Sequence, residues 1–216
     1  MSPARLLRLA GLASVAAGVL LVVTQLLFSL FSLSFVVADG DPVRHARSPL
    51  VGVNGLLTLL AVSLLLLGLV GLYARQSAAS GTLGLLGFLV AFLGTLLLAG
   101  YWWWEAFAVP YLAEQAPALV AATPTGRLLA GRTMSFGVFA LGWVLCGLAS
   151  VRARVFPRDA GILLLLGGGI GLWIATVPGA GIPLAVAVAV AVGWMGMGLL
   201  RSDRGGQAEP RPRRRR

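Results

Sequence analysis

Six long apolar runs, separated by short polar segments, dominate the hydropathy pattern of the chain. They cover residues 6–38, 50–74, 82–104, 133–151, 160–177 and 182–200. A helix of roughly 20 apolar residues is enough to cross a hydrocarbon core of about 30 Å. The alternating Ala and Val of the sixth run resemble a strand, but a lone strand cannot satisfy its backbone in lipid. The pattern therefore predicts an all-α, polytopic membrane protein, with one domain of six transmembrane helices over residues 1–200.

Composition supports this interpretation and narrows the class of protein. The chain has 216 residues, of which 58% are hydrophobic and 11% are charged, whereas soluble domains have roughly 25% charged residues. All 17 basic residues are arginines, which is typical of a GC-rich bacterial genome, so we expect a multi-pass protein of the bacterial inner or plasma membrane. The positive charge does not require nucleic acid as a partner, because basic residues beside membrane helices follow the positive-inside rule.

The distribution of arginines predicts the orientation. With both termini in the cytoplasm, 13 arginines lie inside and only four lie outside, which is the asymmetry expected of short cytoplasmic loops. The inside set is Arg5, Arg8, Arg75, Arg152, Arg154, Arg158 and seven arginines of the tail; the outside set is Arg44, Arg47, Arg127 and Arg132.

Residues 201–216 are expected to form a disordered basic tail on the cytoplasmic side. Its last four residues, Arg213, Arg214, Arg215 and Arg216, are expected to attract anionic lipids at the cytoplasmic face. The simpler alternative is a solvated tail without a role.

Three consecutive tryptophans mark the outer membrane boundary in the middle of the chain. Trp102, Trp103 and Trp104 follow the third apolar run and precede Glu105. Indole rings favour the headgroup level, so these side chains are predicted interfacial anchors.

Two prolines follow this boundary and predict that the helix ends there. Pro110 and Pro117 should break the helix, and Tyr111–Arg132 is too polar to span a membrane. We expect this segment to lie on the outer surface, as a short interfacial helix.

Polar residues predicted at the same outer side form the one candidate cluster, which is Glu105, Asn54, Gln25, Arg127 and Arg132. The simplest interpretation of Glu105 is a solvated carboxylate beside an aromatic belt. One alternative is an ion pair with an outer arginine that fastens Tyr111–Arg132 as a lid over the bundle; another is a contact with a ligand.

No catalytic, cofactor or metal site is predicted. Asp39, Asp41 and His45 could bind a cation, but an Asp-x-Asp pair in a Gly/Pro turn is common without metal. Cys146, the single cysteine, lies in an apolar run and is expected to be inert. An enzyme would need clustered nucleophiles and bases, so we expect a protein that is not an enzyme.

Two motifs carry a resemblance. One is the aromatic stretch with Glu105, Phe107, Pro110, Leu112-Ala113 and Ala116-Pro117; the other is Arg152-Ala-Arg-Val-Phe-Pro-Arg158 before a Gly/Leu-rich run. Together they resemble uncharacterised six-helix integral membrane proteins of bacteria grouped in domain-of-unknown-function families. The resemblance implies six helices and transfers no activity or site residues.

Two functions remain open. The first is a non-catalytic packing or regulatory component of the membrane, with a membrane protein partner or a second copy as its neighbour. The alternative is a small-molecule transporter or ligand-binding module with an outer-side site, because Gly167–Gly169 could break the fifth helix and expose backbone carbonyls.

Overall fold

The computed structural model describes residues 3–38, 40–174 and 182–205, and every regular element in these ranges is helical. This confirms the predicted all-α class. The elements are α1 (Pro3–Ala38), α2 (Pro42–Ala46), α3 (Pro49–Trp103), η1 (Trp104–Ala108), α4 (Val109–Gln115), α5 (Pro117–Ala121), α6 (Gly126–Ala153), α7 (Arg158–Ile174) and α8 (Ile182–Gly205). Residues 175–181, where the fifth apolar run ends and the sixth begins, lie outside the described residues.

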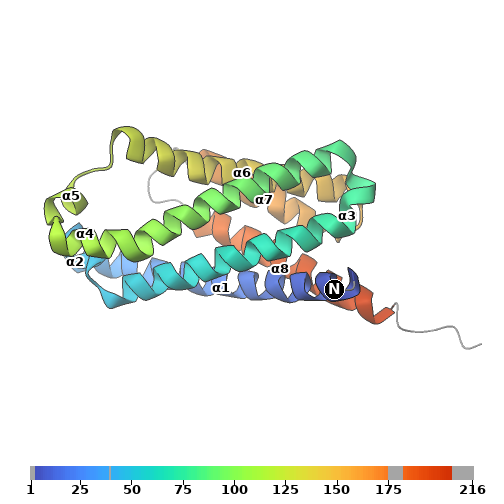
Figure 1. Cartoon of the computed structure of the whole chain (residues 1–216), viewed down its shortest axis with the longest axis horizontal. Coiled ribbons are helices and arrows are strands. Elements are labelled where there is room, and N and C mark those ends of the chain that lie inside the picture. The colour runs from blue at the N-terminus through green and yellow to red at the C-terminus, as the bar shows by residue number, and fades with distance from the viewer. Residues whose placement is uncertain (1–2, 39, 175–181, 206–216) are drawn as a thin grey trace, which may run out of the picture.

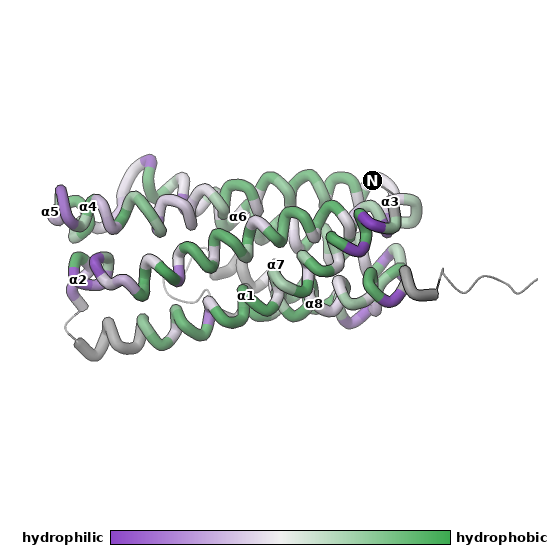
Figure 2. Tube along the Cα trace, turned by 60° about the horizontal axis from the view of Figure 1, so that its bottom comes forward, coloured by the Kyte–Doolittle hydropathy of each residue, from purple (hydrophilic) through white to green (hydrophobic). Residues whose placement is uncertain are grey.

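Among the residues that the structure describes, three helical segments are long and apolar enough to cross a membrane, which supports the predicted membrane protein. They are Ala4–Phe31, Pro49–Gln115 and Gly126–Ala153. Large apolar side chains cover their outer surfaces; Leu60 and Leu67, for example, are 50% and 60% exposed. Hydrophobic residues fill the middle of the bundle and hydrophilic residues gather toward its ends (Figure 2). A surface so rich in exposed leucine is suited to lipid and not to water.

The longest helix, α3, doubles back on itself at Gly81. As a straight helix its 55 residues would be about 80 Å long, but Gly81 has φ 55° and ψ −150°, outside the helical region. The chain runs from the α2 end of the molecule to the opposite end and returns (Figure 1). Its two arms, 49–80 and 82–103, are about 48 and 33 Å long. The return brings Gly55 and Ala106 together, so that a Cβ on Gly55 would lie 3.1 Å from the Ala106 Cα.

The helices form a closed ring. α1 packs between α8 and α3, α6 packs between α3 and α7, and α7 also contacts α8. The largest fully buried side chains come from different members of the ring and include Trp143, Leu65, Leu164 and Met195. The core therefore lies along the bundle axis.

Small residues line the interfaces and allow close backbone contact. A Cβ on Gly142 of α6 would collide with the backbone of Ala91 in α3. On α1, a Cβ on Gly18 would lie 2.6 Å from the carbonyl oxygen of Ala189 in α8. Ser14 is fully buried and its hydroxyl donates to the Ala10 carbonyl, 2.8 Å away, so this polar group is satisfied within its own helix.

One end of the ring, here called the arginine end, holds the chain start, the Gly81 bend, the α6–α7 connection and the end of α8 (Figure 1). Two buried polar side chains join elements there: the Ser150 hydroxyl donates to Gln76 Oε1 over 2.9 Å. α6 ends in the left-handed conformation at Arg154, whose N–H reaches the Ser150 carbonyl over 3.1 Å. The other end carries α2, α4 and α5 and is here called the aromatic end.

Several helices extend beyond the apolar runs predicted to span the membrane. The helix that begins at Pro49 continues past residue 74 to Ser80, because a single glycine suffices for the bend. The fourth helix begins at Gly126 and includes residues expected to lie on the surface. The chain remains helical to Gly205, so part of the predicted tail extends α8; residues 206–216, with Arg213–Arg216, lie outside the described residues.

Pro110 also fails to end the helix. A π-helical turn at Trp104–Ala108 precedes it, and Pro110 then occupies the first turn of α4, where its missing N–H costs little. The helical path therefore continues to Gln115, and only Pro117 interrupts it.

The bend at Gly81 gives a testable prediction. Its φ and ψ are accessible mainly to glycine, and no atom lies within 4 Å of a Cβ built there, so Gly81→Ala should act through backbone strain alone. We expect a loss of about 1–3 kcal/mol in the free energy of unfolding, measured by denaturation in detergent. Gly100→Ala is the matched control, because Gly100 is helical with equally open space and should gain up to about 1 kcal/mol. An equal response of the two variants would contradict the bend.

Candidate functional site

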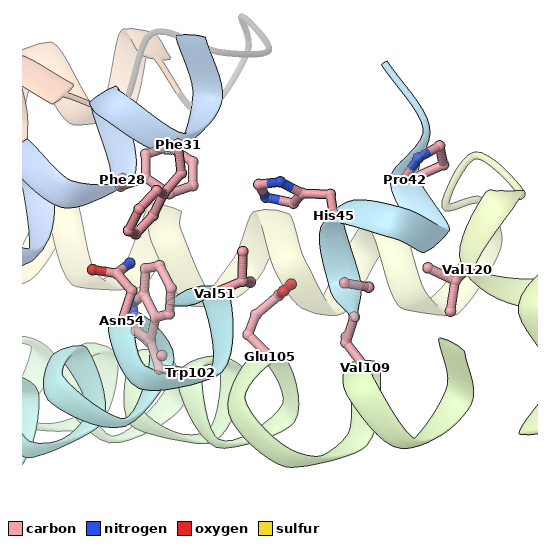
Figure 3. Close-up of a pocket in the computed structure, with 12 residues that line it drawn as sticks. Phe28, Phe31, Pro42, His45, Val51, Asn54, Trp102, Glu105, Val109 and Val120 are labelled. Carbon is pink, nitrogen blue, oxygen red and sulfur yellow. The ribbon is translucent and has the colours of Figure 1, made fainter. Parts of the chain in front are cut away.

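A cavity of about 210 Å³ lies at the aromatic end, between α1, α2, both arms of α3 and the short helices that follow. We call it the capped cavity (Figure 3). Its described lining residues are Phe28, Phe31, Pro42, His45, Ala46, Val51, Asn54, Gly55, Trp102, Glu105, Val109 and Val120. An apolar cavity of about 150 Å³ is large enough for benzene, so this one has room for a single ring with a polar substituent.

Aromatic rings form the wall of the cavity next to α1. Phe28 and Phe31 are three residues apart, which places both on one face of α1. Trp102 faces them from the returning arm of α3, and the rings gather on one side of the cavity (Figure 3). Trp102 also makes an edge contact with Tyr101, with 5.5 Å between ring centroids. The Trp102 indole is thus part of the cavity wall, whereas the sequence predicted only an interfacial anchor at this position.

Asn54 is the most deeply buried polar group in the lining. It lies on the first arm of α3, is 4% exposed, and its Oδ1 has no hydrogen-bond partner among the described residues. The backbone carbonyl of Asn54 accepts from the Thr58 hydroxyl over 2.8 Å, so the main chain is satisfied while the side chain is not. A buried polar atom without a partner costs about 1–3 kcal/mol, and this oxygen is fully buried, with no surface open to the cavity.

Glu105 enters the cavity from η1, where the π-helical turn directs its carboxyl toward α2 (Figure 3). Tyr101, one turn earlier, is a hydrogen-bond partner of this carboxyl. The guanidinium carbon of Arg132 lies 5.9 Å from the centre of the Tyr101 ring, and its charge acts on Tyr101 and Glu105. Arg132 itself is not in the lining.

His45 approaches the cavity from α2, opposite Glu105 (Figure 3). Burial lowers the pKa of His45 below its usual value, which favours the neutral imidazole. Asp41 is the N-cap of α2 and accepts from the Val43 N–H over 2.9 Å. Among the described residues, no three His, Cys, Asp or Glu side chains are placed to share a metal ion.

Arg47 fastens the cover of the cavity. Its Nε and Nη2 both donate to the carbonyl oxygen of Ala113 in α4, over 3.0 and 2.7 Å. This contact joins residues 66 positions apart and ties the α2–α3 connection to α4. Arg47 therefore holds α4 by hydrogen bonds to a backbone carbonyl. One hypothesis from the sequence was instead an ion pair between an outer arginine and Glu105.

The predicted cluster is only partly assembled. Glu105 and Asn54 share the cavity lining, and Arg132 lies behind Tyr101. Gln25 is half-buried on α1 and Arg127 is exposed at the start of α6, and neither is in the lining. Trp103 is 54% exposed and pairs with the Phe107 ring at 5.7 Å; Trp104 is half-buried in η1.

The sequence did not predict that Phe28, Phe31 and His45 line a cavity. It also did not predict that Arg47 holds α4 through the Ala113 carbonyl. The three-residue spacing of the two phenylalanines is a usable signal for a shared face. His45 and Arg47 offered none, because their function depends on how α2 lies over helices distant in sequence.

Comparison of the chain with protein-family models, with curated proteins and with solved structures found no match. The resemblance to six-helix bacterial membrane proteins therefore stays a prediction, and any function has to be inferred from the residues themselves.

The Arg47 contact gives a prediction about the cover. Arg47→Gln removes the charged donors to Ala113, so α4 should open more often, and backbone amide exchange in Val109–Gln115 should become roughly 5–10-fold faster. Hydrogen exchange with mass spectrometry measures this directly. Arg127→Gln is the control, since that side chain is exposed and outside the lining. If both variants exchange like the wild type, Arg47 does not hold the cover.

Proposed function

We propose that this chain is a non-catalytic integral membrane protein that binds a small molecule in the capped cavity. The observation that carries the proposal is the cavity itself: a space of about 210 Å³, walled by aromatic rings, into which the Glu105 side chain projects (Figure 3). Ligand sites are typically concave and mostly apolar, with a few convergent polar groups. A packing component with no ligand would gain nothing from an open cavity.

We further propose six membrane spans, made by α1, the two arms of α3, α6, α7 and α8. The bend at Gly81 supports counting α3 twice, because each arm is long enough for a core of about 30 Å. α7 has 17 residues, and Val186–Arg201 of α8 is apolar, so both approach spanning length.

We propose that the arginine end faces the cytoplasm of a bacterial cell. Arg5, Arg75, Arg152 and Arg201 belong to elements that meet at that end, which supports the positive-inside orientation. Anionic lipid is the partner we propose there, with the terminal arginines adding about 1 kcal/mol each. A membrane protein partner or a second copy remains a proposal for the lipid-facing surface; nucleic acid is not proposed.

Binding is favoured over transport. The transport hypothesis drew on a possible break in the fifth helix at Gly167–Gly169, but α7 is continuous through these residues. Gly167 packs against Val188 of α8, and Gly168 packs against Val144 of α6. These two glycines serve helix packing, so no exposed carbonyls are available there for an ion or substrate.

The orientation can be tested by labelling single cysteines on a Cys146→Ala background. Thr123→Cys, in the α5–α6 connection, should react with an impermeant maleimide in right-side-out vesicles. Asp159→Cys, at the arginine end, should react only after permeabilisation. Both positions are exposed, so the two variants control for each other. The reverse pattern would overturn the proposed topology.

Ligand binding can be tested with a neutral single-ring probe. We expect 4-fluorobenzyl alcohol to bind the full chain in nanodiscs saturably, as measured by ¹⁹F NMR of the probe. Val51→Trp fills the capped cavity and should abolish the saturable part, leaving only partition into lipid. Leu60→Trp, on the exposed face of α3, is the control and should keep it. Binding that is equal in the wild type and in Val51→Trp would sink the proposed function.

A further inference from the structure

The polar groups in the capped cavity are matched to a ligand that donates hydrogen bonds and carries positive charge. Glu105 supplies a carboxyl; the Asn54 side chain also belongs to the lining, but its Oδ1 is fully buried. His45 is the only described lining residue able to carry positive charge, and burial disfavours that form. Neither arginine near the cavity is in the lining: Arg47 donates to the Ala113 carbonyl, and Arg132 lies over the Tyr101 ring, from where its charge also acts on Glu105.

The aromatic wall favours the same kind of ligand. The faces of indole and phenyl rings carry partial negative charge and attract cations within about 6 Å of the ring centre. Phe28, Phe31 and Trp102 line one side of the cavity, while Glu105 enters from the η1 side (Figure 3). A cation between them would meet rings and a carboxyl at once, and its charge would stabilise the ionised carboxylate.

We propose that the capped cavity binds an organic ammonium group, held by the Glu105 carboxylate and the rings of Trp102, Phe28 and Phe31. The assignment rests on the proposed function, because it names the chemical class of the ligand for that same cavity. The cavity volume of about 210 Å³ limits the part of the ligand inside it to one ring, or a comparably short chain, beside the ammonium group.

Two sources can supply this chemistry at a membrane surface. One is a free organic cation; the other is the ammonium of a lipid headgroup, such as that of phosphatidylethanolamine. Both would place the same group between the rings and the carboxylate.

The test compares two probes of the same shape in the full chain. The nanodiscs contain only neutral glycolipid, so that no lipid ammonium group competes for the cavity. In them, 4-fluorobenzylammonium should bind at least roughly tenfold more tightly than 4-fluorobenzyl alcohol. Glu105→Gln should bring the two affinities together while leaving alcohol binding intact, which also shows that the variant folds. Glu114→Gln is the control, because Glu114 is an exposed carboxylate of α4 outside the lining, and it should keep the preference.

Addition of phosphatidylethanolamine to the nanodiscs separates the two sources. A lipid headgroup in the cavity weakens the apparent affinity of 4-fluorobenzylammonium, whereas a site for free cations keeps it unchanged. Equal affinity of the wild type for both probes would overturn the ammonium assignment and leave the proposed function standing. Loss of binding of both probes would overturn both. The wild-type ratio decides the assignment even if Glu105→Gln does not fold.

Discussion

Close contact between helix backbones is the constraint on which the rest of this structure depends. In lipid, burying a leucine against another helix gains little, because the hydrocarbon tails are equally apolar. Association therefore relies on van der Waals contact, and glycine gives the closest approach. Gly142 against Ala91 and Gly18 against Ala189 show this on two sides of the ring. Among the glycines that the structure describes, more lie in close contact with another part of the chain than adopt a positive φ.

The capped cavity arises where this close contact gives way to larger side chains. Along α1, Gly11 and Gly18 pack on the α8 backbone, whereas Phe28 and Phe31, further along the helix, line the cavity. Rings of this size prevent backbone contact and leave room between α1 and the two arms of α3. The short helices α2, α4 and α5 then cover that room, and Arg47 holds α4 in place. The cavity thus forms at the point along α1 where glycines at the helix interface are replaced by phenylalanines.

Buried polar side chains are satisfied to different degrees in this bundle. At the arginine end, Gln76 and Ser150 form a hydrogen bond between α3 and α6, which specifies how those helices meet. Asn54 Oδ1 at the aromatic end and Ser80 Oγ beside the bend have no hydrogen-bond partner among the described residues. Such atoms occur at both ends of the bundle, so the candidate site is identified by its cavity, its rings and Glu105.

The sequence by itself determined the all-helical class and the apolar segments, because these depend on local hydropathy and on backbone needs in lipid. It also pointed to Glu105 and Asn54 as members of one cluster. Only the tertiary structure decided that Gly81 bends α3, that a π-turn carries the helix past Pro110, and that Arg47 fastens α4. These features depend on contacts between segments far apart in the chain, and a hydropathy pattern contains no information about which helix faces which.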